Sequence, residues 1–518
     1  MKSRAGSLPE TLVLVASLLG LGGSGQIAAA RPATQLDLES TPARATAHPL
    51  WRDRAGRLNH DALEALSLLA AANREGLDPD DYDATELQCA GTLLERPGAS
   101  SADIAVFDER LTASVVRYLH DLHEGRVDPR ALGFRMNAPP DGHDFAALVT
   151  AAVADHRLAA LVEEFTPHLA LYRNLRSALA RYRLLAADAD SETVPTGGSV
   201  HPGAEYPAAQ ILKRRLEAVG DLPDDTVRSV AVPPVYAGSL VDGVRRFQRR
   251  HGLDPDGVLG AKTQAALRVP LTWRVQQIEL ALERLRWLPH LEDERFVGVN
   301  IPTFRLAAWN AVRPEGLPAF QSAVIVGRAL NTRTPVFVEE MRYLVFRPYW
   351  NVPSSILRHE ILPAIVRQPD YLRRHDMEVV SGPGQPMRVR QRPGPANALG
   401  LVKFVFPNDD DVYMHGTPVP ALFGRARRDF SHGCVRVEDP VGLAQWALGD
   451  QPEWTRDRIL EAMNGPASRR VELSRPIRVV LFYLTAVVAP EDGAIHFAED
   501  IYGHDLRLHQ VLTRKTGS

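Results

Sequence analysis

The sequences FVGVNI at residues 296–301 and IRVVLFYLT at residues 477–485 mark the two ends of a β-rich region. Both are rich in β-branched and aromatic residues, a composition typical of strands. Between them, SAVIV at residues 322–326 and MRYLVF at residues 341–346 have the same character and are bounded by turn residues. We therefore expect a mainly β domain over residues 293–490.

A helical segment interrupts this β region. Residues 354–374 place Ile356, Leu357 and Ile361 at helical spacing, and a Gly/Pro-rich stretch follows at residues 381–395. A helical insertion between strands could lie over an active site as a lid. We expect a capping insertion at about residues 350–396.

The first half of the chain has a helical pattern throughout. Its apolar residues recur at helical spacing, and glycine with proline stops the helices at residues 76–79 and 125–129. A linker rich in Ser, Thr, Gly and Pro spans residues 188–207. We expect a helical domain over residues 50–200 and a small helical module over residues 205–270. The whole chain is then a multidomain α+β protein.

Length and charge agree with several soluble units. At 518 residues, the chain is long enough for about three domains. Its 60 basic and 63 acidic residues leave a net charge of -3, whereas proteins that bind nucleic acid usually have an excess of positive charge. We expect no nucleic-acid partner.

The N-terminus has the layout of a secretory signal. Lys2 and Arg4 precede an apolar run at residues 12–19, and three alanines end at Ala30. We expect a signal peptide over residues 1–30, with retention as a membrane anchor as the alternative. No later stretch is long and apolar enough to cross a bilayer, so no stable membrane span is expected after cleavage.

Only two cysteines occur, Cys89 and Cys434. An exported chain with so few cannot depend on a disulfide framework, although one bridge between them is formally possible. Cys89 lies in a helical pattern. Cys434 ends the segment SHGC at residues 431–434, whose residue types suit a catalytic site. We expect Cys434 to be a free thiol.

His415 is the candidate base for that thiol. The thiolate is the nucleophilic form of cysteine, so a catalytic cysteine needs an imidazole nearby. The other ring nitrogen of the base needs a partner, and the Gly416 carbonyl is the simplest one, since no acidic residue is obviously placed. The N–H groups of Gly433 and Cys434 are candidates for an oxyanion site.

Two other interpretations of these residues remain open. A lone cysteine in a β domain is often a small buried hydrophobe. A zinc site using His415, His432 and Cys434 is chemically conceivable, although His-x-Cys is an unusual chelate spacing and a fourth ligand is not evident. We expect no metal and no organic cofactor.

The segment from His415-Gly416-Thr417 to Ser431-His432-Gly433-Cys434-Val435-Arg436 resembles the signature of the L,D-transpeptidase (YkuD) catalytic domain. The resemblance implies a YkuD-like β-sandwich, with Cys434 as nucleophile and His415 as base. His432 and Ser431 then have structural or oxyanion-shaping roles. Many relatives have asparagine where this chain has Arg436, but the large periplasmic YcbB-like subgroup tolerates arginine.

That subgroup also has a helical scaffold domain and a peptidoglycan-binding module, which match residues 50–200 and 205–270. The sequence from Tyr349 to Pro353, with Trp350 and Asn351, resembles its entry to the cap. Tyr413 resembles a tyrosine that helps to line its oxyanion site.

The implied activity is acyl transfer between peptidoglycan tetrapeptide stems in the periplasm. A cysteine acyl-enzyme forms with release of D-alanine, and a second stem accepts the acyl group to give a 3→3 cross-link. Carbapenems are expected to acylate the same cysteine. Three alternatives remain. The protein could be an L,D-carboxypeptidase, or an enzyme that attaches a wall protein or exchanges a D-amino acid. It could also be a non-catalytic peptidoglycan-binding protein.

Overall fold

The structure is a computed structural model that describes residues 49–515 with short gaps. The gaps are residues 97, 137–141, 188–192, 224–233, 289–290, 292–293, 311–316, 329–331, 382–383 and 490–492. The predicted signal peptide over residues 1–30 lies outside the described residues. Within the described part, no helix is both long and apolar enough to span a membrane.

The N-terminal helices share one core. They are α1 (His60–Ala70), α2 (Ala84–Leu94), α3 (Ser101–Glu124), α4 (Phe145–Ala154) and α5 (Leu158–Phe165), with short turns η1 (Ala72–Glu75), η2 (Pro79–Tyr82) and η3 (Pro129–Leu132). Polar N-caps start three of them: Asn59 for α1, Ser100 for α3 and Asp144 for α4, each accepting a hydrogen bond from a backbone N–H of the first turn. The buried hydrophobic residues of the five helices, with Trp51, form a single cluster, whereas Leu132 of η3 packs with the sheet.

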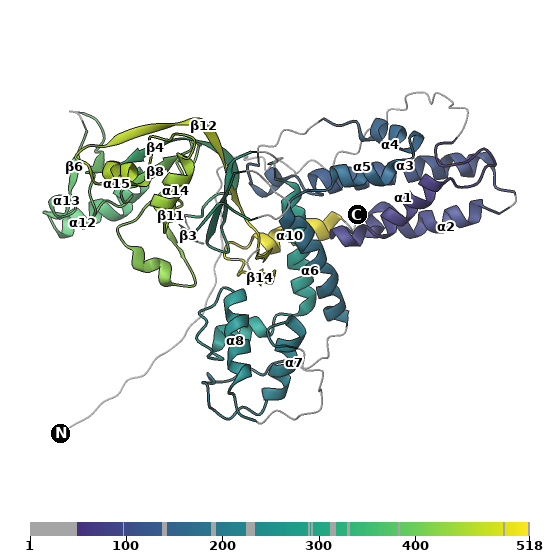
Figure 1. Cartoon of the computed structure of the whole chain (residues 1–518), viewed down its shortest axis with the longest axis horizontal. Helices are drawn as coiled ribbons and strands as arrows, with labels where there is room; N and C mark the ends of the chain where they lie inside the picture. The colour runs from purple at the N-terminus through teal and green to yellow at the C-terminus, as the bar shows by residue number, and fades with distance from the viewer. Residues whose placement is uncertain are drawn as a thin grey trace, which may run out of the picture. The chain divides into compact units, whose positions relative to one another are not determined.

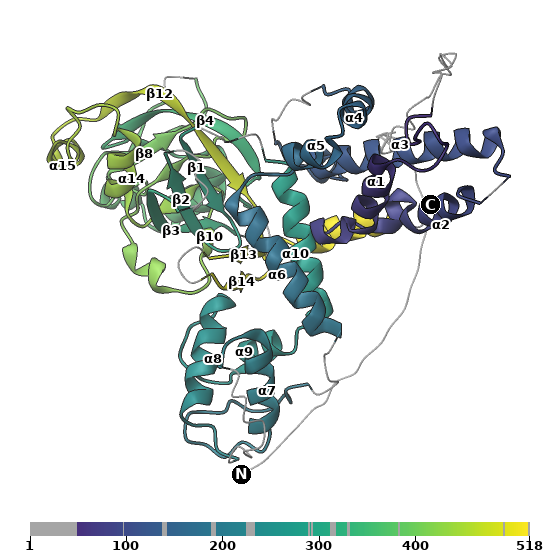
Figure 2. The same cartoon turned by 45° about the vertical axis from the view of Figure 1, so that its right-hand side comes forward.

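A second core joins segments that are distant in sequence. Helix α6 (Ala170–Ala187) lies along α10 (Leu271–Arg286) in both Figure 1 and Figure 2. The same core includes the small module of α7 (Ala209–Val219), α8 (Ser239–Arg250) and α9 (Ala261–Leu267), and the hairpin of β13 (Ala486–Val488) and β14 (Ile495–Phe497). Helix α6 falls within the predicted scaffold range, but its buried face packs into this second core.

The C-terminal half is built on a nine-stranded sheet. Its strands are β1 (Phe296–Asn300), β2 (Arg305–Trp309), β3 (Phe320–Gly327), β4 (Phe337–Phe346), β8 (Val402–Val405), β9 (Met414–His415), β10 (Asp429–Ser431), β11 (Val435–Val437) and β12 (Arg469–Phe482). Their order is β10-β3-β11-β9-β8-β4-β12-β1-β2, and β2 also pairs with β3. This last pairing closes the sheet on itself, so the two layers expected of a sandwich belong to one continuous sheet.

Helices complete the core of this domain. The turn η5 (Pro420–Gly424) lies between β9 and β10, and helices α14 (Pro440–Ala447) and α15 (Arg456–Asn464) lie between β11 and β12. Helix α16 (His504–Lys515) follows the last strand. Leu508 of α16 is buried in the same cluster as the sheet, so this core extends beyond the predicted limit at residue 490. A buried ion pair of 2.5 Å between Arg284 Nη1 and Asp505 Oδ1 ties α10 to α16.

The N-terminal region also contributes to the sheet domain. Phe134 and Met136 are buried in the cluster formed by the sheet. The Arg135 N–H donates to the Val336 carbonyl at 3.0 Å, and the Val338 N–H donates to the Arg135 carbonyl at 3.1 Å. The segment after α3 is therefore bound to the start of β4 as a short parallel bridge.

The predicted insertion is a small α/β unit with its own core. It contains β5 (Trp350–Asn351), α11 (Ser354–Ile356), the π-helical turn η4 (Leu357–Ile361), α12 (Leu362–Arg367), α13 (Tyr371–Arg374), β6 (Met377–Val379) and β7 (Val389–Gln391). The sequence indicated its helices, and the structure adds a three-stranded sheet of order β5-β7-β6. Leu357, Ile361 and Val389 form its buried centre.

Candidate active site

Strand alternation brings the candidate residues to one face of the sheet. Strands β9 and β11 pair in parallel, with Met414 opposite Val435 and His415 opposite Arg436. Met414 and Val435 are fully buried in the core. Because successive side chains of a strand point to opposite faces, His415 and Arg436 face away from that core. Cys434 immediately precedes Val435 and lies on their side of the sheet.

His415 is buried and oriented by backbone. Its Nδ1 lies 2.5 Å from the Gly416 carbonyl oxygen, the partner expected from the sequence. A carbonyl can only accept, so Nδ1 carries the proton and Nε2 has the lone pair. Burial, followed by the charge of Arg436, lowers the pKa of His415 to about 3, although the Gly416 carbonyl acts in the opposite sense. At neutral pH the ring is uncharged and can accept a proton at Nε2.

Cys434 is half-buried, and its Sγ lies 3.8 Å from the Asp411 carbonyl oxygen. Burial raises the pKa of the Cys434 thiol, because a thiolate is poorly solvated there. Hydrogen bonds from the Tyr413 backbone and hydroxyl, and then the charge of Lys403, oppose this effect on the pKa. The resting residue is therefore a thiol whose surroundings already contain donors for the thiolate. Cys89 is exposed, and both cysteines are free.

The turn before Cys434 is held by Ser431. Its hydroxyl donates to the Cys434 carbonyl at 2.5 Å and accepts the Gly433 N–H at 3.2 Å. Gly433 has a φ of 112°, which a side chain would strain. The Gly433 N–H was expected at the oxyanion site, but it is engaged by Ser431. The Cys434 N–H has no hydrogen-bond partner within the described part of the chain.

A second layer supports Gly433 and was not apparent in the sequence. Thr334 is buried, and its hydroxyl donates to the Gly433 carbonyl at 2.7 Å and accepts the Gly327 N–H at 2.9 Å. Tyr502 donates to the Gly327 carbonyl at 2.6 Å and accepts the Thr334 N–H at 3.1 Å. No local pattern marks these residues, because their contacts join segments that are far apart in sequence.

The insertion contacts the site at two points. His432 Nε2 lies 2.6 Å from Glu360 Oε1 in the π-helical turn η4. A hydrogen bond involving the Trp350 side chain tends to lower the pKa of Tyr413, but burial dominates and raises that pKa overall. Asn351 is exposed on β5 and makes no side-chain hydrogen bond to any described residue. The insertion thus lies beside the nucleophile turn, with Trp350 directed to the site and Asn351 away from it.

Two cations share the face of the sheet with His415. Arg436 stands opposite His415 on β11, and Lys403 stands opposite it on β8. Lys403 was not singled out from the sequence, although it interrupts the apolar run at residues 401–406. Burial lowers the pKa of both Arg436 and Lys403. Arg436 Nε is buried and has no hydrogen-bond partner among the described residues.

Among the described residues, the ligand atoms of His415, His432 and Cys434 do not all lie within 4.8 Å of one another, as a shared zinc ion would require. His415 Nδ1 is bound to a carbonyl, and His432 Nε2 is bound to Glu360.

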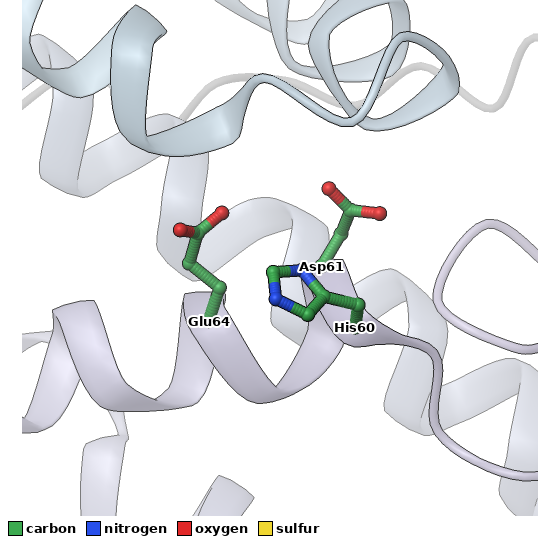
Figure 3. Close-up of side chains that lie close together, drawn as sticks. All are labelled: His60, Asp61 and Glu64. Carbon is green, nitrogen blue, oxygen red and sulfur yellow. The ribbon is translucent and has the colours of Figure 1, made fainter.

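Elsewhere, His60, Asp61 and Glu64 at the start of α1 have ligand atoms within 4.8 Å of one another (Figure 3). Asp61 is buried, and its Oδ2 lies 2.7 Å from His156 Nδ1, so this carboxylate already joins α1 to the end of α4.

Comparison with known families matches three parts of the chain to domain families. Residues 294–468 match the L,D-transpeptidase catalytic domain, residues 205–267 match a peptidoglycan binding domain, and residues 43–179 match the scaffold domain. The chain therefore contains a YkuD-type L,D-transpeptidase catalytic domain joined to a scaffold and a peptidoglycan-binding domain. This confirms the resemblance, and the domain content agrees with the YcbB-like architecture.

One curated relative is a protein of Haemophilus influenzae named "Putative L,D-transpeptidase". It is 33% identical to this chain over 254 residues. The match covers 45% of this chain and 49% of the relative, so it extends over about half the length of each protein.

Proposed function

We propose that this protein is a peptidoglycan L,D-transpeptidase that forms 3→3 cross-links between stem peptides through a cysteine acyl-enzyme. The observation that carries the proposal is the placement of Cys434 beside β9, where His415 is held by the Gly416 carbonyl with Nε2 unprotonated. A nucleophile, a base and a group that orients the base are the parts that acyl transfer requires.

In the first step, the Cys434 sulfur attacks the carbonyl carbon of the third residue of a donor stem. The thiol proton passes to His415 Nε2, and an oxyanion forms on the carbonyl oxygen. The Cys434 N–H, with Tyr413 beside it, is the donor best placed to stabilise that oxyanion. The intermediate collapses, the bond to D-alanine breaks, and His415 returns the proton to the leaving amine.

In the second step, the side-chain amine of diaminopimelate in an acceptor stem attacks the thioester. His415 takes a proton from this amine as the amide forms, and the departing thiolate is reprotonated. Two chemical steps with an enzyme-bound acyl group lead us to expect ping-pong kinetics. The same acyl-enzyme would serve an L,D-carboxypeptidase, which uses water as the acceptor. A carbapenem is expected to acylate the free thiol of the same cysteine, Cys434.

The proposed location is the periplasm. Peptidoglycan, the material recognised by two of the matched domains, lies outside the cytoplasmic membrane. The N-terminal signal pattern of residues 1–30 supports export from the cytoplasm.

Mass spectrometry of products from defined disaccharide-tetrapeptides tests the activity. We expect a dimer joined at the third residues and released D-alanine. Cys434→Ala should abolish both while leaving binding to isolated peptidoglycan largely intact, because Cys434 lies outside residues 205–267, which match the binding domain. Cys89→Ala is the matched control and should keep full turnover. Normal dimer formation by Cys434→Ala would rule out the mechanism, and a hydrolysed tripeptide as the main product would favour the carboxypeptidase.

A further inference from the structure

The surroundings of Cys434 and His415 do not by themselves favour ionisation of the Cys434 thiol. In many cysteine enzymes a protonated histidine stabilises the thiolate. Here burial and the neighbouring Arg436 lower the pKa of His415 to about 3, so the ring is neutral at physiological pH. Burial also raises the pKa of Cys434. Proton transfer from sulfur to His415 is therefore uphill unless another group stabilises the negative sulfur.

Lys403 is placed to supply that charge. It pairs directly with His415 across β8 and β9, so both side chains are on the same face of the sheet. Its Nζ lies 3.6 Å from the centroid of the Tyr413 ring. Lys403 is half-buried and makes no ion pair within 4.0 Å in the part of the chain that the structure describes. The ammonium is therefore not neutralised by an adjacent carboxylate, although Asp411 acts on it from farther away.

Tyr413 connects this lysine to the nucleophile. The Val435 N–H donates to the Tyr413 carbonyl at 3.0 Å, which sets Tyr413 beside Cys434 across the β9–β11 pair. The Tyr413 side chain favours the thiolate by hydrogen bonding and so lowers the pKa of Cys434. The ammonium of Lys403 thus contacts the ring of the tyrosine that favours the Cys434 thiolate.

The other charged groups around the sulfur are few. Asp411 acts on both Cys434 and Lys403, and its negative charge opposes ionisation of the thiol. Arg436 acts on Cys434 and His415, and Arg328 acts on Arg436. The charges of Arg436 and, to a smaller extent, Lys403 both lower the pKa of His415. Lys403 has the additional contact with Tyr413, which Arg436 lacks.

We propose that Lys403 is a positioning residue of this site, whose ammonium stabilises the Cys434 thiolate as it forms and holds Tyr413 against the sulfur. The proposal rests on the proposed function, in which Cys434 is the nucleophile. The proton still moves from Cys434 to His415 Nε2, and Lys403 keeps all of its own protons. Its contribution is electrostatic.

Thiol alkylation measures this effect without any wall substrate. In a Cys89→Ser background, Cys434 is the only thiol of the chain. The rate of its reaction with iodoacetamide, followed by peptide mass from about pH 6 to about pH 10, reports the thiolate fraction. Lys403→Met keeps the aliphatic stem and removes the charge. We expect it to shift the profile to higher pH and to lower the rate at neutral pH about tenfold.

Two variants separate charge from shape. Lys403→Arg retains the charge and should restore the alkylation rate to within about threefold of the parent protein. Lys262→Met removes an exposed lysine of α9 in the peptidoglycan-binding domain and should leave the profile unchanged. An unaltered profile in Lys403→Met would overturn the proposal, as would a shift of equal size in Lys403→Arg.

The experiments distinguish a failure of the proposed function from a failure of this inference. If the parent protein gives no cross-linked or hydrolysed product although Lys403→Met shifts the alkylation profile, the transpeptidase assignment is wrong and the electrostatic role of Lys403 stands. If products form and the alkylation profile of Lys403→Met does not move, the reverse holds. Circular dichroism spectra that match the parent protein confirm that each variant is folded.

Discussion

The hydrogen bonds of Thr334 to the turn that carries Cys434 give the sharpest test of what fixes the geometry of the site. Thr334→Val replaces a hydroxyl with a methyl group of similar size, so packing is nearly conserved. It leaves the Gly433 carbonyl and the Gly327 N–H without their partner in a buried environment. Each buried backbone group that loses its partner costs about 1 to 3 kcal/mol, so we expect a loss of about 3 kcal/mol in unfolding free energy.

Activity should fall further than stability alone explains. The Gly433 carbonyl is one bond from the Cys434 N–H, so a displaced Gly433 moves the proposed oxyanion donor. A displacement on the order of 1 Å at a catalytic group can reduce turnover about 100-fold. We expect Thr334→Val to lower kcat on tetrapeptides at least about tenfold at a temperature where the variant remains folded.

Thr332→Val is the matched control. Its hydroxyl donates to the Ser431 carbonyl at 3.1 Å, but that carbonyl also accepts the Arg328 N–H at 3.1 Å, and Thr332 is half-buried. We expect this variant to lose at most about 1 kcal/mol in urea unfolding monitored by tryptophan fluorescence. Equal losses of stability and turnover in the two variants would refute the reasoning, and so would a Thr334→Val protein indistinguishable from the parent.

Two further outcomes are expected. Glu360→Ala removes the carboxylate that lies 2.6 Å from His432 Nε2 and should increase hydrolysis relative to transfer about threefold, because a loosened cap admits water. Glu340→Ala on β4 is the control, and an unchanged product ratio would contradict a role for the contact. His415 and His504 both have a pKa lowered to about 3, chiefly by burial, so the unfolded chain binds more protons below about pH 6.5. Stability should therefore fall as the pH drops, by about 2 kcal/mol for each histidine between about pH 6.5 and about pH 5 in urea titrations, and a flat profile in this window would disagree with their buried, neutral state.

Much of the architecture could be predicted from local patterns. The runs at residues 296–301 and 477–485 correspond to β1 and to the end of β12, and they pair in parallel in one sheet. The helical pattern of the first half is present, with Gly76 in the left-handed conformation after η1. The contact between His415 and the Gly416 carbonyl could be proposed because the two residues are adjacent and no acidic residue was available.

Other features of the site depend on which strands are neighbours. An alternating pattern tells which residues of one strand share a face, but it does not tell which strand lies beside it. No local pattern therefore marks Lys403, because its place opposite His415 follows from the pairing of β8 with β9. The hydrogen bond from the Gly433 N–H to the Ser431 hydroxyl likewise depends on the geometry of the turn. Residue types alone do not tell whether that N–H is free.

By itself, the sequence determined the chemistry that is available: one thiol in a turn with glycine, one histidine before a turn, and an α+β chain with three recognisable domains. These properties follow from residue type and short-range periodicity. Only the tertiary structure decided the closure of the sheet by β2 and β3, the support of Gly433 by Thr334, and the place of Lys403 beside Tyr413. Each of these arises from contacts between residues far apart in the chain, and such contacts form only when the buried faces pack together.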